Sequence, residues 1–333
     1  MPVRLYRTRS RAAVLASLIL ALAVGSAATG CAGLRPRSSA LGTIGSPYDV
    51  PGSVQSAEPA ELPGWVPALL TTSPALRWSH RVAGADVVVL GGGPSPDLTE
   101  IERMGREAIA TLEREWLRPW PQRLLIVAPA DRAQLAQVAK VPADRLADSA
   151  AMAIRGPGTG SYIVLDPVAW SQATTAGRRA LLVHEAVHVA VAAQLSDPPS
   201  ASATAKPAMT AATTADSVAE AAPPWLSEGF AQDVAYRAIG VQPRDVAAGL
   251  LQRIALDGPP TRLPDAADLM AVDSSREDAY ALAWLVVRTL RRLGGSDAAR
   301  RVQEAGSLAT VGITSSELLR AWQEDLRQLA PSQ

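Results

Sequence analysis

Residues 181–190 have the sequence LLVHEAVHVA, which places His184 and His188 four positions apart with Glu185 between them. The surrounding stretch, 175–195, is mostly apolar and predicts one long helix. Residues four apart lie on the same face of a helix, so both imidazoles can reach a single metal ion. Glu185 projects from beside that face and can reach a water molecule on the ion. The spacing therefore predicts a metal site with an adjacent carboxylate.

The alternative for His184 and His188 is that they are ordinary core residues. The chain has 3 histidines, and two of them stand in this motif among apolar neighbours. Burying a glutamate and two histidines without partners would cost free energy, whereas a metal ion would satisfy all three groups. Zinc lowers the pKa of a bound water to about 7, so that Glu185 could act as general base.

A second motif, WLSEGFA, occupies residues 225–231 and contains Glu228. Together with the HEAVH motif it resembles the gluzincin zinc metallopeptidases, within them the peptidase-MA-like family, over about residues 150–295. The resemblance implies that His184, His188 and Glu228 bind one Zn²⁺ per chain and that Glu185 is the catalytic base. It also implies a peptide or protein substrate whose peptide bond is hydrolysed. The alternative for Glu228 is a solvated acid near the start of a helix.

The same resemblance implies further parts of the site. Tyr280 stands where related proteins have a tyrosine that stabilises the tetrahedral intermediate, and its alternative is a packed core residue. The strand Ser149–Ile154 would pair with the substrate main chain, or be an ordinary buried strand. Some family members have an acid four positions after the metal-binding glutamate; here this position is Gln232, followed by Asp233. Endopeptidase and aminopeptidase activity both remain open.

The order of predicted elements gives an α+β fold class, with a mixed N-terminal sheet and helices, a zinc-binding helix pair and a mostly helical C-terminal half. By resemblance this fold is zincin-like. Strands are expected within 82–90, 123–127, 150–154 and 162–165, and helices over 97–116, 132–138, 175–195 and 225–239. Further helices are expected up to residue 329, with breaks at 258–260 and 294–295. Leu226, Phe230, Val234 and Ala238 are expected to form one apolar stripe.

The N-terminal segment predicts export. Four arginines precede an apolar stretch at 12–29, which is followed by Cys31, the 1 cysteine of the chain. Residues 1–31 resemble a bacterial lipoprotein signal, which implies lipidation of Cys31 and a membrane anchor on the extracytoplasmic face. An ordinary cleaved signal peptide and an uncleaved single-span anchor are the alternatives. Residues 32–75 predict a flexible tether, and 76–333 a zincin-like domain with a low-complexity insert at 196–223.

Composition limits the possible functions further. The 333 residues have a formal net charge of +0 and no basic cluster, which argues against nucleic acid as a partner. Two alternatives to an enzyme stay open. One is a non-catalytic zincin-like lipoprotein that acts as a binding or envelope-assembly module. The other is a structural zinc protein in which His80, the remaining histidine, completes a closed four-ligand site.

Overall fold

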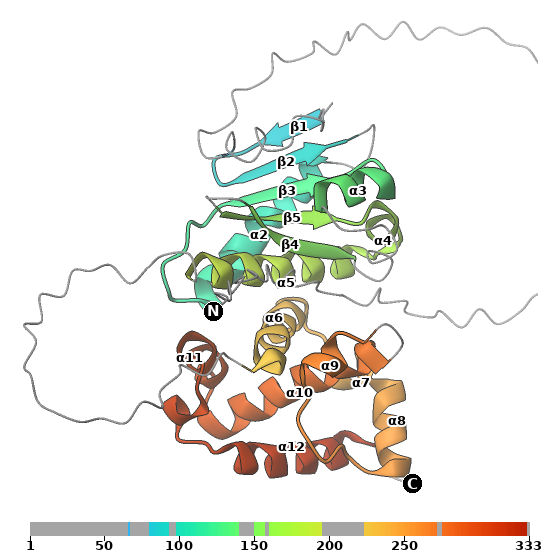
Figure 1. The fold of residues 1–333 in the computed structure, drawn as a ribbon, viewed down its shortest axis with the longest axis vertical. Coiled ribbons are helices and arrows are strands. Elements are labelled where there is room, and N and C mark those ends of the chain that lie inside the picture. The colour runs from blue at the N-terminus through green and yellow to red at the C-terminus, as the bar shows by residue number, and fades with distance from the viewer. Residues whose placement is uncertain are drawn as a thin grey trace, which may run out of the picture.

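The computed structural model describes residues 66, 80–92, 98–139, 150–156, 160–194, 223–271 and 275–331. Within them, a sheet with flanking helices precedes a helical C-terminal half, so the predicted α+β class is confirmed (Figure 1). The predicted signal segment with Cys31 lies outside the described residues. So do the tether, apart from Val66, and the insert, apart from Pro223.

One sheet has the strand order β1-β2-β3-β5-β4. Its strands are β1 (His80–Ala83), β2 (Val87–Gly91), β3 (Leu124–Ala128), β4 (Ala151–Gly156) and β5 (Gly160–Leu165). The three central strands β2, β3 and β5 are parallel, and the outer strands β1 and β4 each run antiparallel to their neighbour. The stretch 82–90 was expected to contain one strand. It holds a hairpin instead, because the chain reverses between Ala83 and Val87, where the Gly84 amide donates to the Val87 carbonyl.

The central strands are buried on both faces, as parallel strands between helices are. Successive side chains of a strand point to opposite faces. Val89, Ile126 and Ile163 therefore face the larger core, whereas Val88 and Val127 face a second, smaller core. The unbroken apolar runs of the sequence follow from this double burial.

Four helices accompany the sheet: α2 (Leu98–Glu115), α3 (Arg132–Ala139), α4 (Pro167–Gln172) and α5 (Thr175–Gln194). Helix α2 packs with the larger core and α3 with the smaller one, so they cover opposite faces. Helix α5 packs against α2, β4 and β5. Asp166 begins α4 by accepting hydrogen bonds from the Val168 and Ala169 amides, an N-cap that the sequence analysis did not identify.

The helical half packs around α10, which contacts α6, α9, α11 and α12. Its elements are α6 (Pro224–Ile239), α7 (Pro243–Val246), α8 (Ala248–Asp257), α9 (Ala266–Leu269), α10 (Ser275–Gly294), α11 (Ala298–Ala305), the 3-10 helix η2 (Leu308–Val311) and α12 (Ser315–Leu329). The breaks predicted at 258–260 and 294–295 are confirmed, since α8 ends at Asp257 and α10 at Gly294. Figure 1 shows α6 between α5 and α10, where it joins the two halves.

Two details differ from the expected pattern. Val66 falls within the predicted tether, yet it is fully buried in the smaller core beside strand residues such as Val88 and Leu125. Ala238 was expected on the apolar stripe of α6 but is exposed, while the next residue, Ile239, packs against the larger core. Among the described residues, no helix has both the length and the hydropathy that a membrane span requires.

Candidate metal centre

Helix α5 places both histidines in the interior. His184 is 0% exposed and His188 6%, and the helix is buried on all sides from Ala180 to Ala190. This follows from its position between the sheet, α2 and α6. A helix enclosed in this way cannot turn a polar residue toward water, so its imidazoles need a partner inside the protein.

Helix α6 brings Glu228 to the same place. Pro224 occupies the first turn, where a missing N–H costs no hydrogen bond, and Glu228 follows one turn later. The carboxylate is buried, which removes the alternative of a solvated acid at a helix start. Gly229 lets α6 approach α10 closely, since a Cβ atom there would lie 2.3 Å from the Ala283 carbonyl oxygen. The WLSEGFA motif thus combines a helix start, an acid and a close helix contact.

The three donor atoms converge on one point. His184 Nε2 and His188 Nε2 lie 3.0 Å apart, and Glu228 Oε2 lies 3.5 Å from the first and 3.4 Å from the second. Two ligands on a tetrahedral zinc ion at about 2.0–2.1 Å would themselves be roughly 3.3 Å apart. The donor triangle therefore has the size that a single ion of this kind requires. The structure brings together the three predicted ligands as a buried group that could bind a metal ion.

The electrostatics of the three groups are coupled. Burial lowers the pKa of His184. Burial would also lower the pKa of His188, but the Glu228 and Glu185 carboxylates together outweigh it and the pKa is raised. Burial opposes ionisation of Glu228, yet the two imidazoles hold the pKa of its carboxyl well below the ordinary range. The cluster is therefore built around an ionised carboxylate, and a cation would complete it.

Glu185 lies beside this cluster without a side-chain partner of its own. It is 0% exposed, and neither carboxylate oxygen has a side-chain hydrogen bond within the described part of the chain. Burial raises its pKa to about 8, while the neighbouring His188 and the backbone amide of Ala153 on β4, which is close enough to donate to the carboxylate, act in the opposite direction. Glu185 therefore lies between the edge strand β4 and the cluster of His184, His188 and Glu228. A buried carboxylate without a side-chain partner is typical of a functional group.

Gln232 and Asp233 point to different neighbours. Gln232 is buried and close enough to His184 to raise the pKa of that imidazole against the effect of burial. Asp233 instead forms an ion pair with Arg291 of α10, with 2.6 Å between Oδ2 and Nε. Hence Gln232, and not the neighbouring acid, lies against a predicted metal ligand. The sequence alone did not decide which of these two neighbouring residues contacts a metal ligand.

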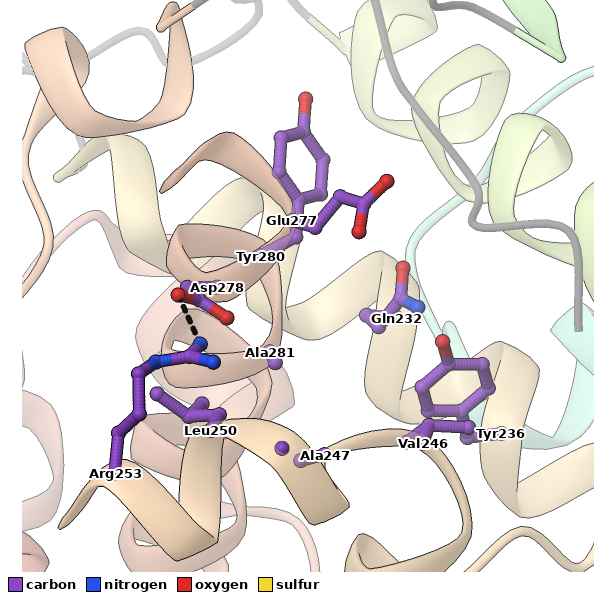
Figure 2. A pocket seen from close by; sticks show the side chains of 11 residues that line it. Gln232, Tyr236, Val246, Ala247, Leu250, Arg253, Glu277, Asp278, Tyr280 and Ala281 are labelled. Carbon is purple, nitrogen blue, oxygen red and sulfur yellow. Dashed lines mark hydrogen bonds and ion pairs between the residues drawn. The ribbon is translucent and has the colours of Figure 1, made fainter. Parts of the chain in front are cut away.

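Tyr280 is buried on α10 and lines a pocket together with Gln232 and Tyr236 of α6 (Figure 2). The pocket shares Gln232 with the surroundings of His184, and a role of Tyr280 in stabilising an intermediate stays a prediction. The pocket also contains Arg253 of α8 and Glu277 of α10, which the sequence analysis missed. No motif marks these two residues, because only the packing of α6, α8 and α10 brings them together.

Strand β4, expected to bind substrate, and His80, the alternative metal ligand, lie at opposite edges of the sheet. Strand β4 is an edge strand next to α5, as expected for the stretch 149–154, of which residue 149 lies outside the described part. His80 begins β1 at the far edge. Four strand spacings of about 4.8 Å put the backbone of His80 roughly 19 Å from β4. The alternative of a closed site completed by His80 is therefore not supported.

In comparisons with known proteins, no family model and no curated protein matches the chain.

Proposed function

We propose that this chain is a zinc-dependent metallopeptidase with a zincin-like site. The observation that supports the proposal most is the juxtaposition of two features. One is the buried donor triangle of His184, His188 and Glu228. The other is the buried Glu185 carboxylate, which has no side-chain hydrogen-bond partner among the described residues.

The donor set favours zinc. Two imidazole nitrogens and one carboxylate oxygen suit Zn²⁺, whereas Mg²⁺ and Ca²⁺ prefer oxygen ligands throughout. Within the described residues the group has three donors, and three protein ligands with one open position are typical of catalytic zinc sites. When bound there, zinc would supply a Lewis acid for a substrate carbonyl and would make a water molecule more acidic.

Glu185 is suited to move the proton. The carboxylate follows His184 in sequence and is buried beside His188 and Glu228, where it can reach a water molecule held at the metal position. The carboxylate would take a proton from the attacking water and give it to the departing amine nitrogen. Its position inside the protein keeps bulk water from competing for that proton.

Strand β4 is suited to bind the peptide backbone. As an edge strand it can pair with one more extended segment, and its Ala153 lies beside Glu185. A substrate paired there would pass the metal cluster in extended form. Tyr280 remains our candidate for stabilising the oxyanion, because it lines the adjoining pocket.

We further propose that the protein is a lipoprotein anchored through Cys31, so that the substrate would be an extracytoplasmic peptide or protein. The second candidate function is a non-catalytic zincin-like module for binding or envelope assembly. Glu185 favours the enzyme, because a scaffold would gain no stability from burying a carboxylate without a side-chain partner.

The decisive experiment compares zinc-loaded wild type with Glu185→Gln on a mixture of unfolded proteins, with cleavage sites mapped by mass spectrometry. We expect cleavage by the wild type that a chelator abolishes and that Glu185→Gln reduces by about 10²–10⁴-fold at unchanged zinc content. Glu113→Gln on the exposed face of α2 is the matched control and should cleave like wild type. Cleavage retained by Glu185→Gln would disprove the mechanism.

A further inference from the structure

A pocket of about 240 Å³ adjoins the metal cluster. It lies between α6, the α7–α8 segment and the first turns of α10, and Figure 2 shows side chains from all three around it. Gln232 belongs both to this pocket and to the surroundings of His184. Gln232 therefore links the wall of the pocket to a proposed metal ligand. Its volume suits one amino-acid side chain and falls below that of pockets for larger ligands.

The walls of the pocket combine apolar and aromatic surface with polar and charged groups. Tyr236 and Leu250 are buried and contribute ring and aliphatic surface, and Tyr280 adds a second ring. Burial raises the pKa of Tyr236 to about 12, so its hydroxyl stays neutral. These walls suit a side chain with a long apolar portion.

The charges that line the pocket do not cancel. Arg253 forms an ion pair with Asp278, so these two neutralise each other. Glu277 is exposed, and the described residues offer its carboxylate neither a hydrogen bond nor an ion pair. In Figure 2 this carboxylate extends from α10 beside the Tyr280 ring, toward the side of Gln232. One negative charge thus remains uncompensated beside apolar walls.

We propose that this pocket binds a basic side chain, lysine or arginine, of the peptide substrate. This inference rests on the proposed peptidase function and adds a substrate class to it. The apolar stem of such a side chain would lie against Tyr236 and Leu250, and its cation would pair with Glu277 beside the Tyr280 ring. An acidic side chain would face the Glu277 carboxylate while Arg253 is already occupied by Asp278.

The test measures binding without cleavage. Acetyl-Ala₃-X-Ala₃-amide peptides, with arginine, norleucine or glutamate as X, are titrated by calorimetry into the full-length zinc-loaded protein that has Glu185→Gln. We expect the arginine peptide to bind about fivefold more tightly than the norleucine peptide, the range of a partly exposed charge pair. The glutamate peptide should bind most weakly.

Two further variants in the same background identify the residue responsible. Glu277→Gln should remove the advantage of arginine over norleucine, and Glu277→Arg should reverse the order of the arginine and glutamate peptides. Glu113→Gln, at an exposed site on α2, should leave all three affinities unchanged. Zinc content and melting temperature confirm that each variant is folded.

The proposal is overturned if the three peptides bind equally, if none binds, or if the arginine preference survives in Glu277→Gln. It is also overturned if glutamate is preferred and Arg253→Gln abolishes that preference, which would identify a site for anionic groups. Failure of the proposed function has a separate signature. If wild type cleaves no peptide or protein while the Glu277-dependent preference persists, the pocket binds basic side chains but the chain is not a peptidase.

Discussion

His188 Nε2 on α5 and Glu228 Oε2 on α6 lie 3.4 Å apart, although the two helices are separated in sequence by residues 195–223. A metal ion bound between them would join α5, which packs on the sheet, to α6, which packs on α10. Metal binding and the association of the two halves are therefore linked. Because a ligand that binds only the folded state stabilises it, zinc at 1,000 times its Kd would add about 4 kcal/mol.

Glu228→Ala should lose most of the bound zinc, because the variant leaves only two imidazoles in a buried site. Metal content per chain after dialysis, by atomic emission, measures this directly. His80→Ala is the informative control: β1 lies at the far edge of the sheet, so this variant should keep about one zinc per chain. Zinc retained by Glu228→Ala but lost from His80→Ala would contradict the proposed ligand set.

Zinc affinity should fall as the pH is lowered, and the fall should begin at a pH above the ordinary pKa of histidine. His188 must lose its proton before its nitrogen can bind metal, and the neighbouring Glu228 and Glu185 raise the pKa of His188 above 6.5. Affinity should therefore be constant at pH values above this raised pKa. Below it, affinity should decrease by about tenfold per pH unit for each proton displaced.

Competition with a chromophoric chelator between about pH 5.5 and 9 gives this profile. The raised pKa predicts that the decrease has already begun at pH 6.5. An affinity that stays constant from pH 8 down to pH 6 would show that the protein does not hold a proton on His188 in this way.

Gln232→Ala should weaken zinc binding while leaving the fold intact. The side chain lies against His184, and residues that orient a metal-binding histidine typically affect affinity by about 10–100-fold. The same chelator competition measures it, at a pH where His188 is neutral. Unchanged affinity in Gln232→Ala would mean that packing alone orients His184.

Asp233→Ala, one residue further, should instead destabilise the fold and leave zinc affinity nearly unchanged. It leaves Arg291, 13% exposed, without its closest acidic partner and should lower the free energy of unfolding by about 2 kcal/mol. This is below the usual cost of breaking a buried pair for two reasons. Burial raises the pKa of Asp233 despite its pairing, and Glu115 still faces Arg291. Denaturant unfolding of the zinc-free protein measures the change, and zinc affinity should stay within about threefold of wild type.

The sequence predicted the parts of the site that depend on local spacing. His184 and His188 are one helical turn apart wherever α5 packs, and the order of strands and helices already indicated an α+β fold. It could not assign Gln232 and Asp233, because their directions depend on the rotation of α6 relative to α5 and α10. The Glu277 pocket was missed for the same reason: its residues come from three helices and follow no motif. Ala238 was misassigned because periodicity alone does not show that Ile239 packs at the end of α6 instead.

Gly229→Ala tests the close approach of α6 and α10. A Cβ atom at this position would lie 2.3 Å from the Ala283 carbonyl oxygen and 2.9 Å from Val287 Cγ2. Backbone on one side and a buried side chain on the other leave no room, so α6 must shift. We expect a loss of about 3 kcal/mol in the free energy of unfolding, at the upper end for overpacking. Zinc affinity should also decrease, because Glu228 moves with the helix.

Gly249→Ala is the matched control for that substitution. Gly249 lies in α8, and a Cβ atom there would meet only Arg253 Nη1, at an ordinary 3.7 Å. Because alanine favours a helix over glycine, this variant should be more stable than wild type by about 0.5–1 kcal/mol. Denaturant unfolding with and without zinc compares the two. If Gly229→Ala proved as stable and as zinc-loaded as Gly249→Ala, the close helix contact would not be what positions Glu228.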